Sequence, residues 1–212
     1  MLATLESSGH RILCLHGRGS TGALFLEHTL APLAAKLPDT FELHALEAPS
    51  GSGSWWTYPK GERSFSASAF FGADESIAAV EAAMVEKRCT GILGFSQGAM
   101  LGAVVAARAS LGEGKAADYL KFAVICGACL PAPFEPLFSR LRDERGGAEA
   151  LVPVLHCLSA NDDMNPPELG ESLAQCFGGS PSSLLWHDGG HVVPPEDRID
   201  EVVSWLNRVA LQ

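Results

Sequence analysis

The chain has 212 residues, of which 47% are apolar and 19% are charged. This length and composition are typical of a globular protein with a substantial core, so we expect a single domain over residues 1–212. The formal net charge is −10, with 25 acidic residues against 15 lysines and arginines. That balance argues against nucleic acid as a partner, because a polyanion is bound by a basic surface.

The apolar pattern indicates neither a membrane span nor a secretion signal. No segment is apolar for long enough to cross a bilayer, and residues 1–10 lack a basic stretch followed by an apolar core. The cysteines lie within apolar stretches, as expected of buried free thiols in a reducing compartment. They are Cys14, Cys89, Cys126, Cys129, Cys157 and Cys176. We therefore expect a cytoplasmic protein. The sequence leaves its oligomeric state open between a monomer and a homodimer.

Apolar runs alternate with helical periodicities along the chain. A strand at residues 10–16 is followed by a crossover helix at 24–37, where apolar residues recur at helical spacing. Further strands are expected at 41–48, 90–95, 120–126, 152–158 and 183–186. Further helices are expected at 72–86, 99–109, 134–145, 168–177 and 196–211. This alternation predicts an α/β fold with a mostly parallel sheet of about six strands flanked by helices, and ligands at the carboxyl ends of the strands.

Two motifs fit cofactor or redox sites poorly. The glycine-rich loop at residues 17–22 lacks the Lys-Ser/Thr ending of a P-loop, and it fits a dinucleotide fingerprint only weakly, with Glu47 as its acidic residue. Cys126 and Cys129 have redox-motif spacing, but they follow a strand in mid-chain. We expect them to be small core residues. No cofactor and no metal are expected, because histidines and cysteines lack paired ligand spacing.

The stretch Gly94-Phe95-Ser96-Gln97-Gly98 lies between an expected strand and an Ala-rich helix. It matches the G-x-S-x-G nucleophile elbow, in which a serine stands on a sharp turn from strand to helix with its hydroxyl exposed. Glycine is needed two residues before and after the serine, because a Cβ there would collide as the strand turns into the helix. Ser96 is therefore the candidate nucleophile.

A serine nucleophile needs a base, and the base needs a group that orients it. In this architecture the order along the chain is serine, then an acid, then histidine. The pair Asp162-Asp163 follows the strand at 152–158, and two histidines, His187 and His191, follow the next strand. Three segments that are distant in sequence are thus expected to converge at one edge of the sheet.

Either aspartate of the pair could be the acid, and either of the two histidines could be the base. The tight turn at Asn161 favours Asp162, with Asp163 capping or solvating the turn. The flexible Gly189-Gly190 pair lets the backbone approach the serine, which favours His191 as the base. His187 is then expected to be a structural histidine.

The segment at residues 50–73 has no clear periodicity, and a loop of this length in a compact domain is usually functional. Its aromatic side chains, together with Met164, are expected to line an acyl pocket at the strand ends. These aromatic residues are Trp55, Trp56, Phe70 and Phe71. The alternative is that they form ordinary core beneath the loop.

The ordered set of motifs resembles the family of serine hydrolases within the α/β-hydrolase superfamily, which is related to carboxylesterases, acyl-protein thioesterases and polyketide-releasing thioesterases. The resemblance spans residues 10–209. It is carried by Leu15-His16-Gly17, Trp55-Trp56, Glu75-Ser76-Ile77, the stretch from Gly91 to Ala99, His156 six residues before Asp162, and Gly189-Gly190-His191 with Val193-Pro194.

The resemblance implies a triad of Ser96, Asp162 and His191, with oxyanion donors from the backbone of Gln97 and Arg18. It implies hydrolysis of carboxylic esters or thioesters of small to medium acyl substrates through an acyl-enzyme. The short segment at 127–150 favours a minimal lid or none, and hence short, non-interfacial substrates.

Two positions depart from the family pattern. Ser159 stands where glycine is common, which we expect to matter little. Arg18 stands where a bulky apolar residue is common, and it places a cation where an acidic group of the substrate could bind.

Other activities are compatible with the same residues. A chain-releasing thioesterase or a transacylase would differ in the leaving group or the acceptor. A ligand-binding receptor or carrier on a hydrolase scaffold is the alternative from another class. Multiple turnover of a simple ester would distinguish an enzyme from such a receptor.

Overall fold

The computed structural model describes residues 9–145, 152–178 and 183–210. Six parallel strands form one sheet in the order β2-β1-β3-β4-β5-β6. They are β1 (His10–Leu15), β2 (Phe41–Leu46), β3 (Gly91–Phe95), β4 (Phe122–Cys126), β5 (Val154–Ser159) and β6 (Leu184–His187). Each lies within a few residues of an expected strand, so the predicted fold class is confirmed.

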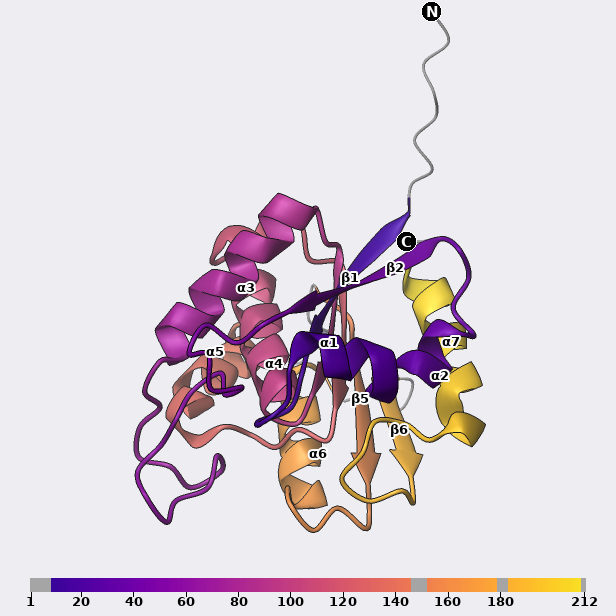
Figure 1. Ribbon diagram of the computed structural model, residues 1–212. Helices are drawn as coiled ribbons and strands as arrows, with labels where there is room; N and C mark the ends of the chain where they lie inside the picture. The colour runs from indigo at the N-terminus through magenta and orange to yellow at the C-terminus, as the bar shows by residue number, and fades with distance from the viewer. Residues whose placement is uncertain (1–8, 146–151, 179–182, 211–212) are drawn as a thin grey trace, which may run out of the picture.

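Helices cover both faces of the sheet (Figure 1). One face carries α3 (Ala73–Lys87), α4 (Gln97–Ser110), α5 (Glu135–Arg145) and α6 (Pro167–Cys176). The other carries α2 (Ala31–Ala34) and α7 (Ile199–Ala210). Every residue of α4 except Arg108 is buried, because this helix packs against the sheet and between α3 and α5. Helix α7 buries one stripe of side chains, as its amphipathic sequence requires.

The expectation of a single crossover helix at residues 24–37 is wrong. The chain instead forms α1 (Gly22–Leu24), a π-helical turn η1 (Phe25–Thr29) and α2, with a break at Leu30. Pro32 explains the break, because it has no N–H to donate to the carbonyl of His28 and its ring crowds that carbonyl. At the other end of the chain, a 3₁₀ turn (Glu196–Arg198) precedes α7, and the expected helix end at Leu211 lies outside the described residues.

All six cysteines are buried. Free thiols are found at Cys14, Cys89, Cys126, Cys129 and Cys157. Burial raises the pKa of the Cys129 thiol to about 12. Cys126 is 1% exposed and Cys129 is fully buried, so the expectation that both are core residues is confirmed.

Helix α4 approaches β1 so closely that residue 98 has to be glycine. A Cβ on Gly98 would meet the backbone carbonyl oxygens of Leu15 and His16. Strands β1 and β3 are neighbours, and the chain continues from them to opposite edges of the sheet, so a crevice opens between the loops that follow them. The close approach brings Ser96 next to the loop at residues 16–22, which we call the β1 loop.

We expect Gly98→Ala to lower the free energy of unfolding by about 1–3 kcal/mol, because the added methyl group overpacks against backbone that cannot move aside. Gly102→Ala is the matched control. In the same helix, its methyl group would meet side-chain atoms, Cγ2 of Ile92 at 2.9 Å and Cδ1 of Ile125 at 3.2 Å, and no backbone atom at the 2.2 to 2.6 Å found for Gly98. Urea denaturation of both variants measures the difference, and an equal or smaller loss for Gly98→Ala contradicts the explanation.

A second core position makes stability depend on pH. His156 in β5 is 1% exposed, and neither ring nitrogen has a hydrogen-bond partner within the described ranges. Burial lowers its pKa to about 3. An unfolded histidine has a pKa of about 6.5. Between these values the unfolded chain binds a proton that the folded chain does not, so this stability is complete above about pH 6.5 and is lost as the pH falls towards 3.

We expect His156→Leu to flatten the fall in unfolding free energy between pH 7 and pH 4.5, because the substitution removes the site that is protonated in the unfolded state alone. Denaturant titrations across this range provide the measurement. His28→Gln is the control, since His28 is exposed and its substitution should leave the slope unchanged. A slope in His156→Leu equal to that of the wild type would contradict this account.

Candidate active site

Ser96 occupies a strained turn between β3 and α4, with a φ of 54° and a ψ of −118°. Among the described residues other than glycine, only Arg88 also has a positive φ. Such a conformation costs about 1–3 kcal/mol and persists where the surroundings impose it. Here the Ser96 N–H donates to the carbonyl of Cys126 at 2.9 Å, and the Ser96 carbonyl accepts from Met100 at 3.0 Å. These bonds hold the hydroxyl at the carboxyl edge of the sheet.

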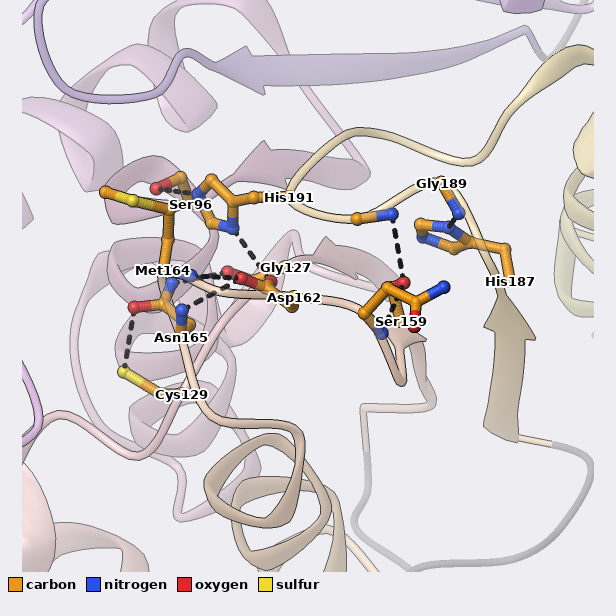
Figure 2. Close-up of polar contacts among 12 residues, drawn as sticks. Ser96, Gly127, Cys129, Ser159, Asp162, Met164, Asn165, His187, Gly189 and His191 are labelled. Carbon is orange, nitrogen blue, oxygen red and sulfur yellow. Dashed lines mark hydrogen bonds and ion pairs between the residues drawn. The ribbon is translucent and has the colours of Figure 1, made fainter.

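Three side chains from three strand ends are hydrogen-bonded in series (Figure 2). Nε2 of His191 lies 2.9 Å from Oγ of Ser96, and Nδ1 lies 2.8 Å from Oδ2 of Asp162. A carboxylate oxygen can only accept, so Nδ1 carries the proton and donates it to Asp162. Nε2 is then left to accept from the serine hydroxyl.

The Asp162 side chain is 4% exposed and is fixed by its own loop. Its Oδ1 accepts from the backbone N–H groups of Met164 and Asn165, each at 2.9 Å, which leaves Oδ2 for the imidazole. Asp163 is exposed. Of the two candidate aspartates, Asp162 is therefore the one in contact with His191.

His187 closes β6 and is 5% exposed. Its Nδ1 accepts from the N–H of Gly189 at 3.1 Å, and burial, followed by the nearby Arg198 cation, lowers its pKa. His187 is thus a buried neutral histidine that shapes the turn. The next glycine, Gly190, has a φ of 75° and turns the chain so that His191 faces the serine.

The Ser159 hydroxyl joins two loops of the site (Figure 2). It accepts from the N–H of Asn161 at 3.2 Å and from the N–H of Gly190 at 3.0 Å, and Ser159 is 2% exposed. Serine in place of glycine was expected to matter little here, but its hydroxyl accepts two hydrogen bonds that a glycine could not accept. The hydroxyl satisfies two backbone donors and ties the loop of Asp162 to the loop of His191.

The Gln97 side chain ties the serine turn to the segment after β2. Its Oε1 accepts from the Trp55 N–H at 3.0 Å, and its Nε2 donates to the Trp56 carbonyl at 2.9 Å. The Trp55 indole donates to the carbonyl of His16 at 2.8 Å. Both tryptophans are 1% exposed, and Phe70 stacks on Trp56 with ring centroids 4.6 Å apart. The assignment of these rings to an acyl pocket is corrected: they belong to the core.

A cavity of about 570 Å³ borders Ser96 and His191, and we call it the Ser96 cavity. Its wall is formed by Gly17 and Arg18, residues 58–64, the start of α4, and Met164 with Asn165. Met164 thus lies where the sequence analysis expected it. Phe71, which is 58% exposed, borders a separate hollow with Trp55 and Trp56.

Two backbone N–H groups border this cavity without an acceptor in the described part of the chain. They belong to Gln97, the first residue of α4, and to Arg18 in the β1 loop. Two donors beside a serine hydroxyl are the arrangement that an oxyanion needs.

The described residues give less support to a dinucleotide site, a metal site or a membrane-spanning helix. Glu47 accepts from the N–H of Gly22 at 2.9 Å, so the carboxylate required by a dinucleotide interpretation closes its own loop. Within the described ranges, no three His, Cys, Asp or Glu side chains are grouped so that they could hold a metal ion. No helix in the described part of the chain is both long and apolar enough to cross a membrane.

The chain is similar to known proteins in both sequence and structure. The profile of the serine hydrolase (FSH1) family matches residues 50–203. Esterase OVCA2 of Danio rerio is 32% identical over 213 residues, with 87% of this chain and 90% of that protein covered. Esterase C25G4.2 of Caenorhabditis elegans is 29% identical, with 95% and 94% covered. The crystal structure of Zea mays acyl-protein thioesterase 2 shares the fold, with a TM-score of 0.65, 20% identity and coverage of 99% and 97%.

The sheet, its helices and these structural likenesses define an α/β-hydrolase. The chain belongs to the serine hydrolase (FSH1) family and is a serine esterase. The resemblance drawn from the motifs is therefore confirmed at the level of the family and of the fold.

We expect Ser159→Ala to lower the free energy of unfolding by about 1–3 kcal/mol, because it removes two partly buried hydrogen bonds, each worth about 0.5–1.5 kcal/mol. Esterase kcat should fall about tenfold with little change in KM, since a positioning defect acts on the chemical step. Ser172→Ala is the control, because it removes a hydroxyl that donates to Glu168 on an exposed helix turn. Equal effects of the two substitutions would show that the Ser159 bridge has no positioning role.

Proposed function

We propose that the protein hydrolyses carboxylic ester or thioester bonds of small to medium acyl substrates, with Ser96 as nucleophile, His191 as general base and Asp162 as the group that orients the imidazole. The hydrogen-bonded series from Ser96 to Asp162 beside the Ser96 cavity carries the proposal. A free serine hydroxyl is a poor nucleophile at neutral pH, and an adjacent, oriented imidazole overcomes this.

Acylation then proceeds through a tetrahedral intermediate. Oγ of Ser96 attacks the carbonyl carbon while its proton moves to Nε2 of His191. The imidazolium is stabilised by Asp162, and the oxyanion accepts hydrogen bonds from the N–H groups of Gln97 and Arg18. As the intermediate collapses, the bond to the leaving oxygen or sulfur breaks, and the imidazolium gives its proton to the departing alcohol or thiol.

Deacylation repeats these steps with water. His191 takes a proton from the water as it attacks the acyl-enzyme, and returns that proton to Oγ of Ser96 when the acid leaves. A thioesterase or transacylase activity would use the same residues and differ in the leaving group or the acceptor.

We also propose a domain organisation, a cellular location and a class of substrate for the enzyme. All six strands belong to one sheet, which supports one α/β-hydrolase domain over residues 1–212. The buried free thiols at Cys14, Cys126 and Cys157 fit a reducing compartment, which supports a cytoplasmic location. The substrate would be a small-molecule ester, with no need for a cofactor.

The test uses p-nitrophenyl butyrate under multiple-turnover conditions. We expect Ser96→Ala, and also Asp162→Asn, to lower kcat by about 10⁴-fold, because each removes an interaction on which the transition state depends. The neighbouring Asp163→Asn is the matched control and should keep kcat within about twofold. A fluorophosphonate probe should label the wild type and not Ser96→Ala.

Three outcomes count against the proposal. A fully active Ser96→Ala variant excludes the nucleophile. A loss of activity in Asp163→Asn that equals the loss in Asp162→Asn excludes the assignment of the acid. A single stoichiometric release of p-nitrophenol without turnover favours a receptor on a hydrolase scaffold.

A further inference from the structure

The wall of the Ser96 cavity has a charge opposite to that of the whole molecule. Three cationic residues, Arg18, Lys60 and Arg63, line it, whereas the chain carries a net charge of −10. Among the described residues, Glu62 is the one acidic residue in the lining. Its carboxylate accepts hydrogen bonds from the N–H and from the hydroxyl of Ser68, so it is engaged within its own loop.

Arg18 extends from the β1 loop, next to the proposed oxyanion site. Its Nη1 donates to the hydroxyl of Tyr58 at 2.9 Å, and the guanidinium carbon lies 5.3 Å from the centroid of the Tyr58 ring. These contacts hold the side chain on the cavity wall without neutralising its charge. A guanidinium has five N–H donors, so most of those of Arg18 stay available for a ligand.

Arg63 lies in the segment after β2 and reaches the loop that carries Asp162. Its Nη2 donates to the carbonyl of Met164 at 3.0 Å. Its guanidinium carbon lies 5.9 Å from the centroid of the Phe65 ring. Like Arg18, it is therefore held by neutral groups and not by an ion pair.

Ion pairing distinguishes these cations from several arginines elsewhere on the molecule. Within the described ranges, no carboxylate oxygen lies within 4.0 Å of the charged groups of Arg18, Lys60 or Arg63. Paired arginines outside the cavity are Arg11, Arg108, Arg140, Arg142 and Arg198. Arg88 and Arg208 are unpaired as well, but of the described unpaired cations it is Arg18, Lys60 and Arg63 that border the cavity.

We propose that this esterase selects anionic substrates, with a carboxylate elsewhere in the ester or thioester binding to Arg18 and Arg63 while Lys60 adds to the attraction. This rests on the proposed function, because the cavity holds the substrate only if Ser96 is the nucleophile. A guanidinium binds a carboxylate through two parallel hydrogen bonds. A cleft lined by one sign of charge also concentrates ligands of the opposite sign.

The experiment compares kcat/KM for three chromogenic esters, each normalised to its rate of hydrolysis by hydroxide. p-Nitrophenyl butyrate is neutral, mono-p-nitrophenyl glutarate carries a carboxylate on the acyl group, and 4-butyryloxy-3-nitrobenzoate carries one on the leaving group. We expect one of the two charged esters to exceed the neutral one by about tenfold. The better charged ester identifies the side of the scissile bond that faces the arginines. Added salt should reduce the preference, because these charges are partly exposed to solvent.

Variants then connect the preference to the cavity wall. Arg18→Gln and Arg63→Gln should each lower the ratio of charged to neutral kcat/KM by about threefold to tenfold, and Arg63→Lys should retain part of the ratio. Using a ratio cancels any general loss of activity. The control is Arg208→Gln, because Arg208 is exposed near the end of α7 and lies beside Leu155 and Leu184, near the amino ends of β5 and β6, whereas Ser96 follows the carboxyl end of β3. Its loss should leave the ratio unchanged.

The outcomes separate this inference from the function on which it rests. A wild type that hydrolyses the butyrate ester without preferring either charged ester overturns the inference and leaves the proposed function standing. A preference that persists in both Arg18→Gln and Arg63→Gln overturns it as well. A wild type that turns over none of the three esters overturns the proposed function itself.

Discussion

The imidazole of His191 has to reach two side chains at once, and the rest of the site is arranged around that requirement. Ser96 follows β3 and Asp162 follows β5, so the end of β4 lies between them in the sheet. Neighbouring strands are about 4.8 Å apart, and a side chain at the end of β4 would fill the gap. The residue there is Gly127, with a φ of 61°, and an added Cβ would lie 3.3 Å from Cε1 of His191. The imidazole thus bridges the gap above this glycine.

The core and the site share residues, which explains why the tryptophans are buried. Gln97 stands directly after the strained serine, and both its amide oxygen and its amide nitrogen are hydrogen-bonded to the backbone of Trp55 and Trp56. The Trp55 indole in turn holds the carbonyl of His16 in the β1 loop. The two segments that border the cavity with free N–H groups are therefore fixed to one aromatic cluster. Rigid support of this kind is what a preorganised oxyanion site needs.

The sequence was informative where a feature depends on local pattern or on strand order. The turn at Ser96 follows from small residues between an apolar run and an Ala-rich helix. The meeting of Asp162 with His191 follows from their positions after successive strands, because parallel strands end at one edge. By contrast, the bridge from Ser159 to Gly190 and the cavity wall at residues 58–64 depend on how distant loops pack. The periodicity of apolar residues along the sequence does not predict contacts between distant loops. The single helix expected at 24–37 does not form, although its apolar residues recur at helical spacing, because Pro32 interrupts the backbone hydrogen bonds.

Net charge and local charge lead to different conclusions for this molecule. The formal charge of −10 argues against polyanionic partners, because such partners sense an extended surface. A small anion inside the Ser96 cavity meets a different field. At physiological ionic strength exposed charges are largely screened beyond about 8 Å, so distant carboxylates contribute little to its energy. Arg18 and Arg63 border the cavity itself and are less screened there. An acidic protein can therefore bind and select an acidic substrate, provided that unpaired cations border the cavity where the reacting bond lies.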